Sequence, residues 1–172
     1  MTFRIIIDGY NLIGSDRGLR GDLEGKRKQL IQRLQQYRES KGHPITLVFD
    51  GWRSGWAHEA QEHTGGITVI FSRQGEKADS VIQRLAREMG SGCVVVTSDR
   101  EVRRAAETAG AAAIYSGEFG ARLQTFDRET FHDEEDVTDH LSEQDIQFQG
   151  KRGNPRRLSK RERKRRERLK KL

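Results

Sequence analysis

A short apolar run that stops at a carboxylate, Phe3-Arg-Ile-Ile-Ile-Asp8-Gly-Tyr-Asn11, predicts the first strand of the fold. An unbroken run of isoleucines suits a strand that is buried on both faces of a parallel sheet. Asp8 would then stand at the carboxyl end of this strand, where open α/β sheets bind their ligands. Gly9 permits a sharp turn, and the Asn11 amide can hold a carboxylate or a water molecule. Asp8 and Asn11 are equally common as simple loop caps, so this stretch alone leaves both interpretations open.

Further apolar runs along the chain predict the remaining strands, at residues 45–49, 67–71, 93–97 and, more briefly, 112–115. Helical patterns lie at 23–41, 101–109 and 116–123. A further helix has Asp79 in its first turn and runs to about residue 89. Strands that alternate with helices predict a parallel sheet with helices on both faces. We therefore expect a three-layer α/β/α domain with a central, mainly parallel sheet of about five strands.

Two stretches have no clear place in this pattern. The glycine-rich residues 13–21 fit neither a Walker A loop nor a dinucleotide fingerprint, so we expect a loop without a nucleotide site. The loop from Trp52 to Trp56 offers aromatic and arginine faces that can stack on unpaired bases, or its indoles fold back onto the core. His58 and His63 have no visible partner, and we expect them to be surface or packing residues rather than metal ligands.

Charge is distributed very unevenly along the chain. Residues 150–172 carry 13 Lys or Arg against Glu162 and Glu167, a local charge of +11, which leaves −5 of the overall +6 for residues 1–149. We expect a domain at 1–130, an acidic linker at 131–149 and a basic tail at 150–172 that is disordered, or helical on binding. This asymmetry predicts a polyanionic partner such as RNA.

Composition excludes several classes of protein. A single cysteine, Cys93, rules out a disulfide framework and a thiolate metal site. Neither a signal segment nor an apolar stretch of about 18 residues is present, so we expect a cytoplasmic protein without a membrane partner. The residues carry no signal for an oligomeric state.

Strand-end acids are the strongest functional signal. Asp8, Asp50 and Asp99 follow strands that would all point the same way, and Asp79 begins a helix at the same edge. Two bare carboxylates about 4 Å apart repel by roughly 4 kcal/mol at an effective dielectric of about 20, which a cation or a bound proton relieves. Oxygen ligands without His or Cys select Mg²⁺ or Mn²⁺. Such a site suits phosphoryl chemistry, although Asp50 in particular can equally be a loop cap, and Ser98 or Asp99 can cap the following helix.

Taken in order, these motifs resemble those of the NYN domains, the PIN-like nucleases, and most closely the bacterial YacP-type group. The resemblance covers roughly residues 3–125 and rests on Asp8-Gly-Tyr-Asn11, Val48-Phe-Asp50-Gly, Lys77-Ala-Asp79 and Thr97-Ser-Asp99. It implies a PIN-like fold and metal-dependent endonuclease activity on RNA. It assigns catalytic or metal-binding roles to Asp8, Asp79 and Asp99, with Asn11 and Asp50 in support.

The sequence departs from this pattern in one respect. Many PIN domains have a further acid at the strand that follows the position of Asp99, and this chain has no obvious acid there. Glu118 and Asp127 are the candidates to replace it, so the number of metal ions stays open.

Our leading hypothesis is a Mg²⁺- or Mn²⁺-dependent endoribonuclease. Asp8 and Asp99 would bind the metal, Asp79 would bind it or position water, and Asp50, Asn11 and Ser98 would support the site. Lys77 and Arg100 are candidates to hold the substrate phosphate, or are ordinary solvated charges. Basic residues of the tail would bind RNA, with the ribosome as one candidate partner, and we single out Arg156, Arg157, Lys160 and Arg161.

Two rival hypotheses come from other classes. In the first, the protein is a non-catalytic RNA- or ribosome-binding module whose acids bind a structural ion or none. In the second, it is a small-molecule phosphatase, but such an enzyme usually has Asp-x-Asp where this chain has Asp8-Gly-Tyr.

Overall fold

The computed structural model describes residues 2–16, 18–51, 57–132 and 160–172. The loop containing Trp52 and Trp56, most of the expected acidic linker, and Arg156 and Arg157 lie outside these ranges. Within them, six strands form one sheet in the order β3-β4-β2-β1-β5-β6. The strands are β1 (Arg4–Asp8), β2 (Ile45–Phe49), β3 (Ala60–Thr64), β4 (Ile67–Phe71), β5 (Cys93–Val96) and β6 (Ala112–Ile114).

All strand pairs except one are parallel, as the alternation of strands and helices predicted. The exception is β3, which pairs with β4 in antiparallel orientation at one edge of the sheet. We did not expect this sixth strand, because its sequence Ala-Gln-Glu-His-Thr is polar. In the structure, four of its five residues are exposed. The turn that joins it to β4 carries the missed signal: Gly65 and Gly66 both have positive φ, as a two-residue type I′ hairpin requires.

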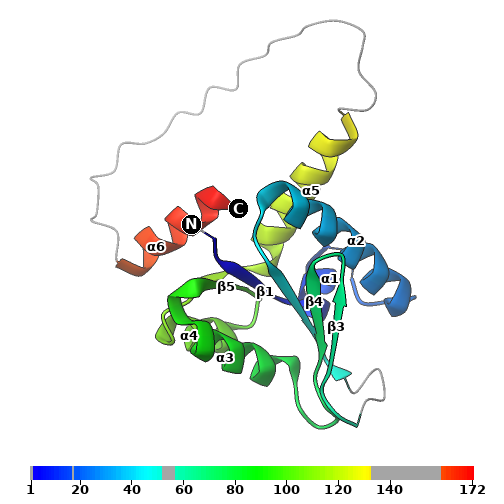
Figure 1. The fold of residues 1–172 in the computed structure, drawn as a ribbon, viewed down its shortest axis with the longest axis horizontal. Helices are drawn as coiled ribbons and strands as arrows, with labels where there is room; N and C mark the ends of the chain where they lie inside the picture. Colours follow the sequence, from blue (N-terminus) through cyan, green and yellow to red (C-terminus); the bar gives the residue numbers. More distant parts are fainter. Residues whose placement is uncertain (1, 17, 52–56, 133–159) are drawn as a thin grey trace, which may run out of the picture.

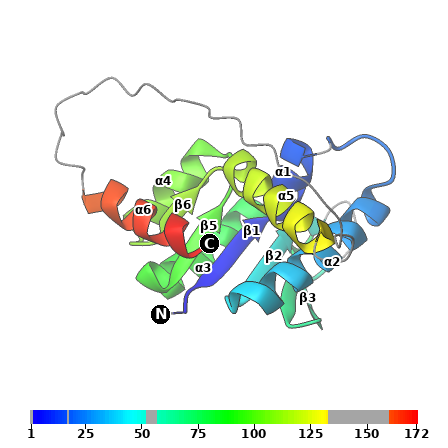
Figure 2. The ribbon, with the colours of Figure 1, turned by 90° about the horizontal axis from the view of Figure 1, so that it is seen from above.

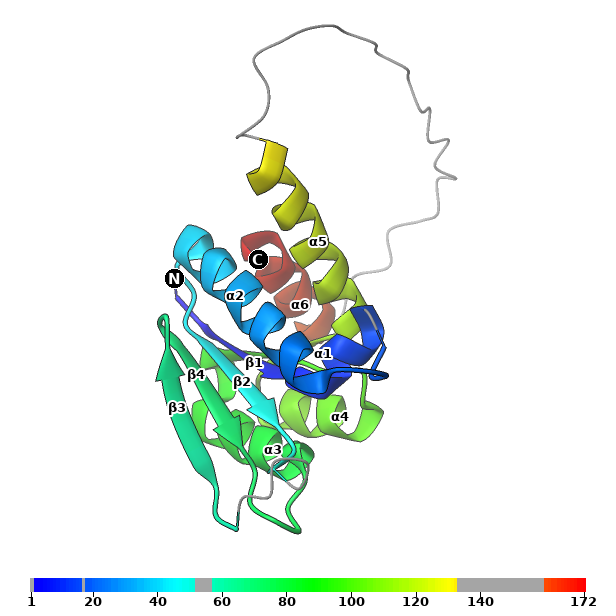
Figure 3. The ribbon, with the colours of Figure 1, turned by 90° about the vertical axis from the view of Figure 1, so that its right-hand side faces the viewer.

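Helices cover both faces of the sheet, which confirms the expected three-layer α/β/α architecture (Figure 1). On one face lie α1 (Gly9–Asp16), α2 (Leu23–Lys41) and α5 (Ser116–His132), and on the other lie α3 (Ala78–Met89) and α4 (Arg100–Thr108). Figure 3 shows α2 and α5 on one side of the strands and α3 and α4 on the other. Helix α2 begins at the predicted cap, where the Asp22 side chain accepts a hydrogen bond from Gly25 N.

Helix α1 replaces the first part of the loop that we expected at residues 13–21. Tyr10, Leu12 and Ile13 are buried against the core, and this packing outweighs the weak helix propensity of the neighbouring glycines. Gly9 itself is required by close packing, because a Cβ there would lie 2.3 Å from the Phe49 ring. Helix α5 is also longer than the predicted 116–123, and Phe126 on its added turns packs against the same core.

The described part of the basic tail is a docked helix, α6 (Lys160–Lys171), and not a disordered segment. Arg168 stacks over the Phe3 ring at 4.6 Å and donates a hydrogen bond to the Ser91 carbonyl. Leu172 is buried, and its carbonyl accepts a hydrogen bond from the Tyr37 hydroxyl. We expected this segment to be disordered without a partner because the apolar face of the helix is narrow. Arginine stems and rings complete the contact that leucines alone do not provide.

Most contacts between α6 and the rest of the domain lie at the amino ends of the strands. Phe3 directly precedes β1, and His43, Ser91 and Gly110 each lie two residues before β2, β5 and β6 respectively. His43 contacts the Lys171 carbonyl, and the Gly110 carbonyl accepts from Lys164. Figure 1 accordingly shows α6 beside the start of β1, and Figure 2 shows β5, β1 and β2 side by side. Among the helices of the described ranges, none is both long and apolar enough to cross a membrane.

The docking of α6 makes a direct prediction for stability. Replacing the buried Leu172 by alanine should lower the free energy of unfolding by about 2 kcal/mol, because apolar contact with the core is lost. Lys170→Ala, on the exposed side of the same helix, should change it by less than about 0.5 kcal/mol. Urea denaturation of both variants tests this difference. Equal stabilities would mean that the helix does not dock in solution.

Candidate active site

The period-two alternation of the strands selects one face of the sheet for the acids. Ile6 and Val48 pack in the core cluster that contains α3 and α4, whereas their strand neighbours pack on the α2 side. Asp8 lies two residues after Ile6, and Asp50 two residues after Val48, so both stand on the α3/α4 side. Asp79 comes from the first turn of α3, and Asp99 is the N-cap of α4.

The electrostatic state of Asp8 reflects these neighbours. Its pKa is raised to about 7, first by burial and further by the carboxylates of Asp79, Asp50 and Asp99, while a hydrogen bond from Asn11 N partly opposes the rise. The pKa of Asp79 is also raised, first by burial and then by Asp99 and Asp50. The structure therefore brings the four predicted acids into one electrostatically coupled group.

Three of these carboxylates also have structural roles. Oδ1 of Asp99 accepts from Glu101 N at 2.8 Å and Val102 N at 3.0 Å, which caps α4. Oδ1 of Asp50 accepts from Ala78 N at 2.6 Å, so it caps α3 from a different loop. Oδ1 of Asp8 accepts from Asn11 N at 3.2 Å. The cap and ligand interpretations are compatible, because each of these bonds uses Oδ1 and, within the described residues, Oδ2 of all three acids receives no hydrogen bond.

Asn11 joins the carboxyl ends of the strands. Its Oδ1 accepts hydrogen bonds from Ser98 N at 2.9 Å and from the Ser116 hydroxyl at 2.6 Å. Helix α1 is thereby tied to the turn after β5 and to the start of α5. Ser98 supports the site through its backbone N–H, while Asp99 provides the helix cap. Ser116 is a supporting residue that sequence reasoning missed, because a serine at a helix start has no distinguishing pattern.

A second missed residue is Glu101, whose charge contributes to the raised pKa of Asp79. Its position two residues after Asp99 is the signal that the sequence offered. Lys77, at the N-cap of α3, has the opposite effect and lowers the pKa of Asp79. Arg100 is the exposed first residue of α4, directly after Asp99. Of the two predicted phosphate-binding cations, Arg100 is therefore adjacent in sequence to Asp99, and Lys77 is close enough to Asp79 to lower its pKa.

Basic residues of the tail do not join this group. Lys160 and Arg161 begin α6, where Arg161 lies 3.9 Å from Glu107 at the end of α4. That end of α4 faces the amino ends of the strands, on the opposite edge of the sheet from the acids. The tail residues that the structure describes are therefore not part of the acidic cluster.

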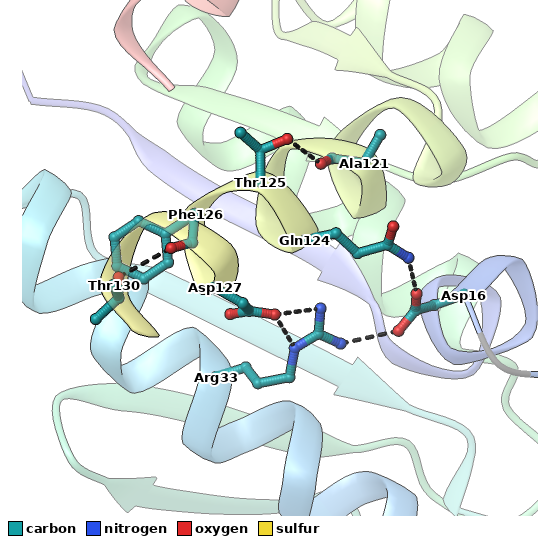
Figure 4. Close-up of polar contacts among 8 residues, drawn as sticks. All are labelled: Asp16, Arg33, Ala121, Gln124, Thr125, Phe126, Asp127 and Thr130. Carbon is teal, nitrogen blue, oxygen red and sulfur yellow. Dashed lines mark hydrogen bonds and ion pairs between the residues drawn. The ribbon is translucent and has the colours of Figure 1, made fainter. Parts of the chain in front are cut away.

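The proposed substitutes for a further acid are engaged elsewhere. Asp127 lies 2.7 Å from Arg33, whose guanidinium also contacts Asp16 at 2.8 Å (Figure 4). This arginine links α1, α2 and α5 on the side of the sheet away from Asp79 and Asp99. Glu118 pairs with Arg165 of α6 at 2.5 Å. Neither acid lies in the cluster, and Glu101 is the better candidate.

The donor set fits a hard divalent cation in chemistry and charge, since it consists of four carboxylates whose mutual repulsion raises the pKa of Asp8 and Asp79. As the side chains stand, no three His, Cys, Asp or Glu of the described ranges converge closely enough to hold a metal ion. The backbone caps hold Oδ1 of three acids in fixed positions. Coordination would therefore use the remaining oxygens and rotation of side chains such as Asp79.

The raised pKa of Asp8 predicts that this residue destabilises the metal-free fold. A group whose pKa is higher in the folded than in the unfolded state contributes stability at low pH and loses it as the pH rises from about 3.8 to about 7. In EDTA at pH 8, Asp8→Asn should therefore raise the free energy of unfolding by between about 1 and 4 kcal/mol. Thermal and urea denaturation measure this gain.

Two comparisons check the cause of that gain. At pH 4 it should disappear, because Asp8 of the wild-type chain is then largely protonated. Added Mg²⁺ or Mn²⁺ should stabilise the wild-type chain more than Asp8→Asn. A variant no more stable than wild type at pH 8 would show that Asp8 is not under electrostatic strain.

Comparisons with known proteins agree with this fold and place the chain in a family. The uncharacterized protein YacP of Bacillus subtilis (strain 168) is 31% identical over 107 residues, which cover 55% of this chain and 59% of the relative's length. A crystal structure of a point mutant of Rae1 (YacP) from Bacillus subtilis superposes with a TM-score of 0.62 at 28% identity, covering 76% of this chain and 80% of that one. A second Rae1 (YacP) structure gives a TM-score of 0.60 at 27% identity, with 75% and 78% covered. A family model of the YacP-like NYN domain matches residues 5–171, which run from the first strand through the basic helix, and this chain therefore belongs to the YacP-like NYN domain family.

Proposed function

We propose that the protein is a metal-dependent endoribonuclease that hydrolyses RNA phosphodiester bonds in the cytoplasm. The observation that carries this proposal is the coupled group of four carboxylates on one face of the sheet, at the edge where parallel sheets bind ligands. The nuclease-like character of the NYN family supports the same reaction class.

Asp8, Asp79 and Asp99, with Asp50, are the residues that would hold Mg²⁺ or Mn²⁺. The bound ion would supply activation of water and charge neutralisation at the scissile phosphate. Buried Asp8 lies at the base of the site, where a bound cation would keep its carboxylate in the charged form. Asp79 is less enclosed and, within the described residues, accepts no backbone hydrogen bond, so it is the acid best suited to position and deprotonate water. Asn11 keeps the turn that carries Asp99 in place.

Exposed cations beside the acids suit a phosphate substrate. Lys77 lies close enough to Asp79 to lower its pKa, and Arg100 begins α4 one residue after Asp99. Either side chain can contact a phosphate oxygen that the carboxylates alone would repel. The wider attraction for RNA would come from α6, whose outward side is strongly basic, with the ribosome as one candidate RNA-containing partner.

A second candidate function is RNA binding without catalysis. One observation favours it: Asp50 and Asp99 cap helices, and no three acids of the described ranges converge on a metal position. In that case the acids would maintain the fold and α6 would provide the activity. The two functions differ in whether metal ions produce cleavage.

One test of the proposed site compares two helix-capping aspartates. Cleavage of single-stranded RNA by the wild-type chain should require Mg²⁺ or Mn²⁺ and stop in EDTA. Asp99→Asn should lower kcat/KM by at least about 100-fold, because a carboxylate ligand is lost while asparagine still caps α4. Asp22→Asn is the matched control, since Asp22 caps α2 through the same type of bond at 2.9 Å and lies outside the cluster.

Each result has a clear consequence. Equal loss in both variants would assign the effect to helix capping and not to chemistry. Metal-independent cleavage that survives Asp99→Asn would reject the proposed site. RNA binding without cleavage by any of the three proteins would favour the second function.

A second test separates RNA attraction from folding. Arg163, Arg166 and Lys170 are exposed and lie on one side of α6. Replacing all three by glutamine should leave the unfolding midpoint nearly unchanged. It should reduce the slope of log Kd against log salt for single-stranded RNA by about 2, because about 0.7 counterions are released per neutralised phosphate.

The matched control is replacement of Lys26 and Lys28 of α2 by glutamine, which changes basic charge at a different place. An unchanged slope in the α6 variant would mean that this helix does not contact the RNA. A fall in the midpoint of several degrees would mean that these residues support the fold.

A further inference from the structure

Tyr115 is an exposed aromatic residue at the acidic edge of the sheet. Its side chain is 46% exposed, and among the described residues it is one of two large exposed hydrophobic residues, with Leu19. It directly follows β6, which pairs in parallel with β5 so that Val96 lies opposite Ile114. Thr97 N donates to the Ile114 carbonyl at 3.1 Å, so Tyr115 stands one strand away from the turn that carries Asp99.

The sheet places Tyr115 on the same face as the acids. Ile114 packs in the cluster on the α2 side, so the next residue along the strand turns to the α3/α4 side. Stacking of the Arg103 guanidinium, which belongs to α4, on the Tyr115 ring confirms this orientation. Asp8 and the N-cap of α4 lie on that side as well.

Two contacts fix this position relative to the acids. Ser116, the next residue, donates to Asn11 Oδ1, which also accepts from Ser98 N. On the other side, the Arg103 guanidinium lies 3.7 Å from the centroid of the Tyr115 ring. Arg103 belongs to the helix that Asp99 caps. Tyr115 is thus connected to the Asp99 turn through both its backbone neighbour and its ring.

An aromatic ring in this setting suits an unpaired base. An exposed hydrophobic ring gains little from water, and its stacked cation holds it in one orientation. Proteins bind single-stranded nucleic acid with such rings, since every base has a π face, and stacked arginine strengthens the contact. A core role would require burial, which the ring lacks.

We propose that Tyr115 stacks on an unpaired base of the RNA next to the scissile phosphate, with Arg103 holding the ring in place. This inference rests on the proposed function and adds a substrate-binding residue to it. It implies that the substrate is single-stranded at that nucleotide, because a paired base has no free face for the ring.

Three variants separate stacking from other roles. Tyr115→Phe keeps the ring, Tyr115→Leu keeps an apolar side chain without π electrons, and Tyr115→Ala removes both. On a single-stranded RNA that the wild-type chain cleaves, leucine and alanine should each raise KM about tenfold with little change in kcat. Phenylalanine should remain within about twofold of wild type. Thermal denaturation of each variant verifies that the fold is intact.

A second measurement locates the base. An abasic nucleotide is placed in turn at each position on either side of the cut. At one position it should raise the KM of the wild-type chain about tenfold, and should add little to the effect of Tyr115→Ala, because the two changes remove the same contact. Independent, additive effects at every position would overturn the inference. So would equal losses from phenylalanine and alanine.

Binding distinguishes failure of this inference from failure of the proposed function. The same RNA, with 2-aminopurine at each position in turn, is titrated with wild type and with Tyr115→Leu without added metal. Quenching at one position that is lost in the leucine variant supports stacking even if the protein never cleaves RNA. Cleavage without such quenching overturns stacking and retains the nuclease. If neither cleavage nor quenching occurs, both the stacking proposal and the nuclease proposal are rejected.

Discussion

Parallel pairing of β4, β2, β1, β5 and β6 is the constraint on which the site depends. It carries the carboxyl end of every central strand to one edge, and the two-residue alternation then determines the face on which each following side chain stands. A slip of one residue in β1 would move Asp8 to the α2 side and place Ile7 among the acids. The buried isoleucines therefore specify the position of the carboxylate as well as the core. Helices α3 and α4 begin at the same edge and add Asp79 and Asp99 from above the same face.

The acids are held in place at an electrostatic cost. Burial and three neighbouring carboxylates keep the pKa of Asp8 near neutrality, so the metal-free fold is less stable than it would be with a neutral residue there. The structure offsets part of this cost with backbone N–H groups, which cap α3 and α4 on carboxylates that also belong to the cluster. One carboxylate thus stabilises a helix end and contributes charge to the site. This double use explains why capping and chemistry are not competing interpretations of Asp50 and Asp99.

Much of this arrangement was predictable from the sequence, because it follows from local patterns. Buried strands, their terminal acids, the Asp22 cap and the family resemblance all rest on contiguous residues, and the structure has them close to the predicted bounds. What could not be predicted depends on tertiary contact. Helix α1 contains glycines and is stabilised by packing of Tyr10 and Leu12, whereas β3 is polar and is held by pairing with β4. Glu101 and Ser116 were missed for the same reason, since each acquires its role from a neighbour distant in sequence or on another element.

The basic helix shows most clearly how position limits function. Its Lys and Arg content predicted a tail that binds RNA, without indicating where the tail lies. Arg168, Lys164 and Leu172 fix it at the amino ends of the strands. The positive surface and the acidic cluster therefore lie at opposite edges of the domain. A short oligonucleotide at the acids would not reach α6, whereas a long or folded RNA can contact both edges at once and gain from the higher effective concentration of the second contact. Separation of the two surfaces also keeps cations of α6 from pairing with the carboxylates of the acidic cluster. If both surfaces act on one RNA, affinity should depend on RNA length much more steeply than the rate of cleavage of the bound strand does.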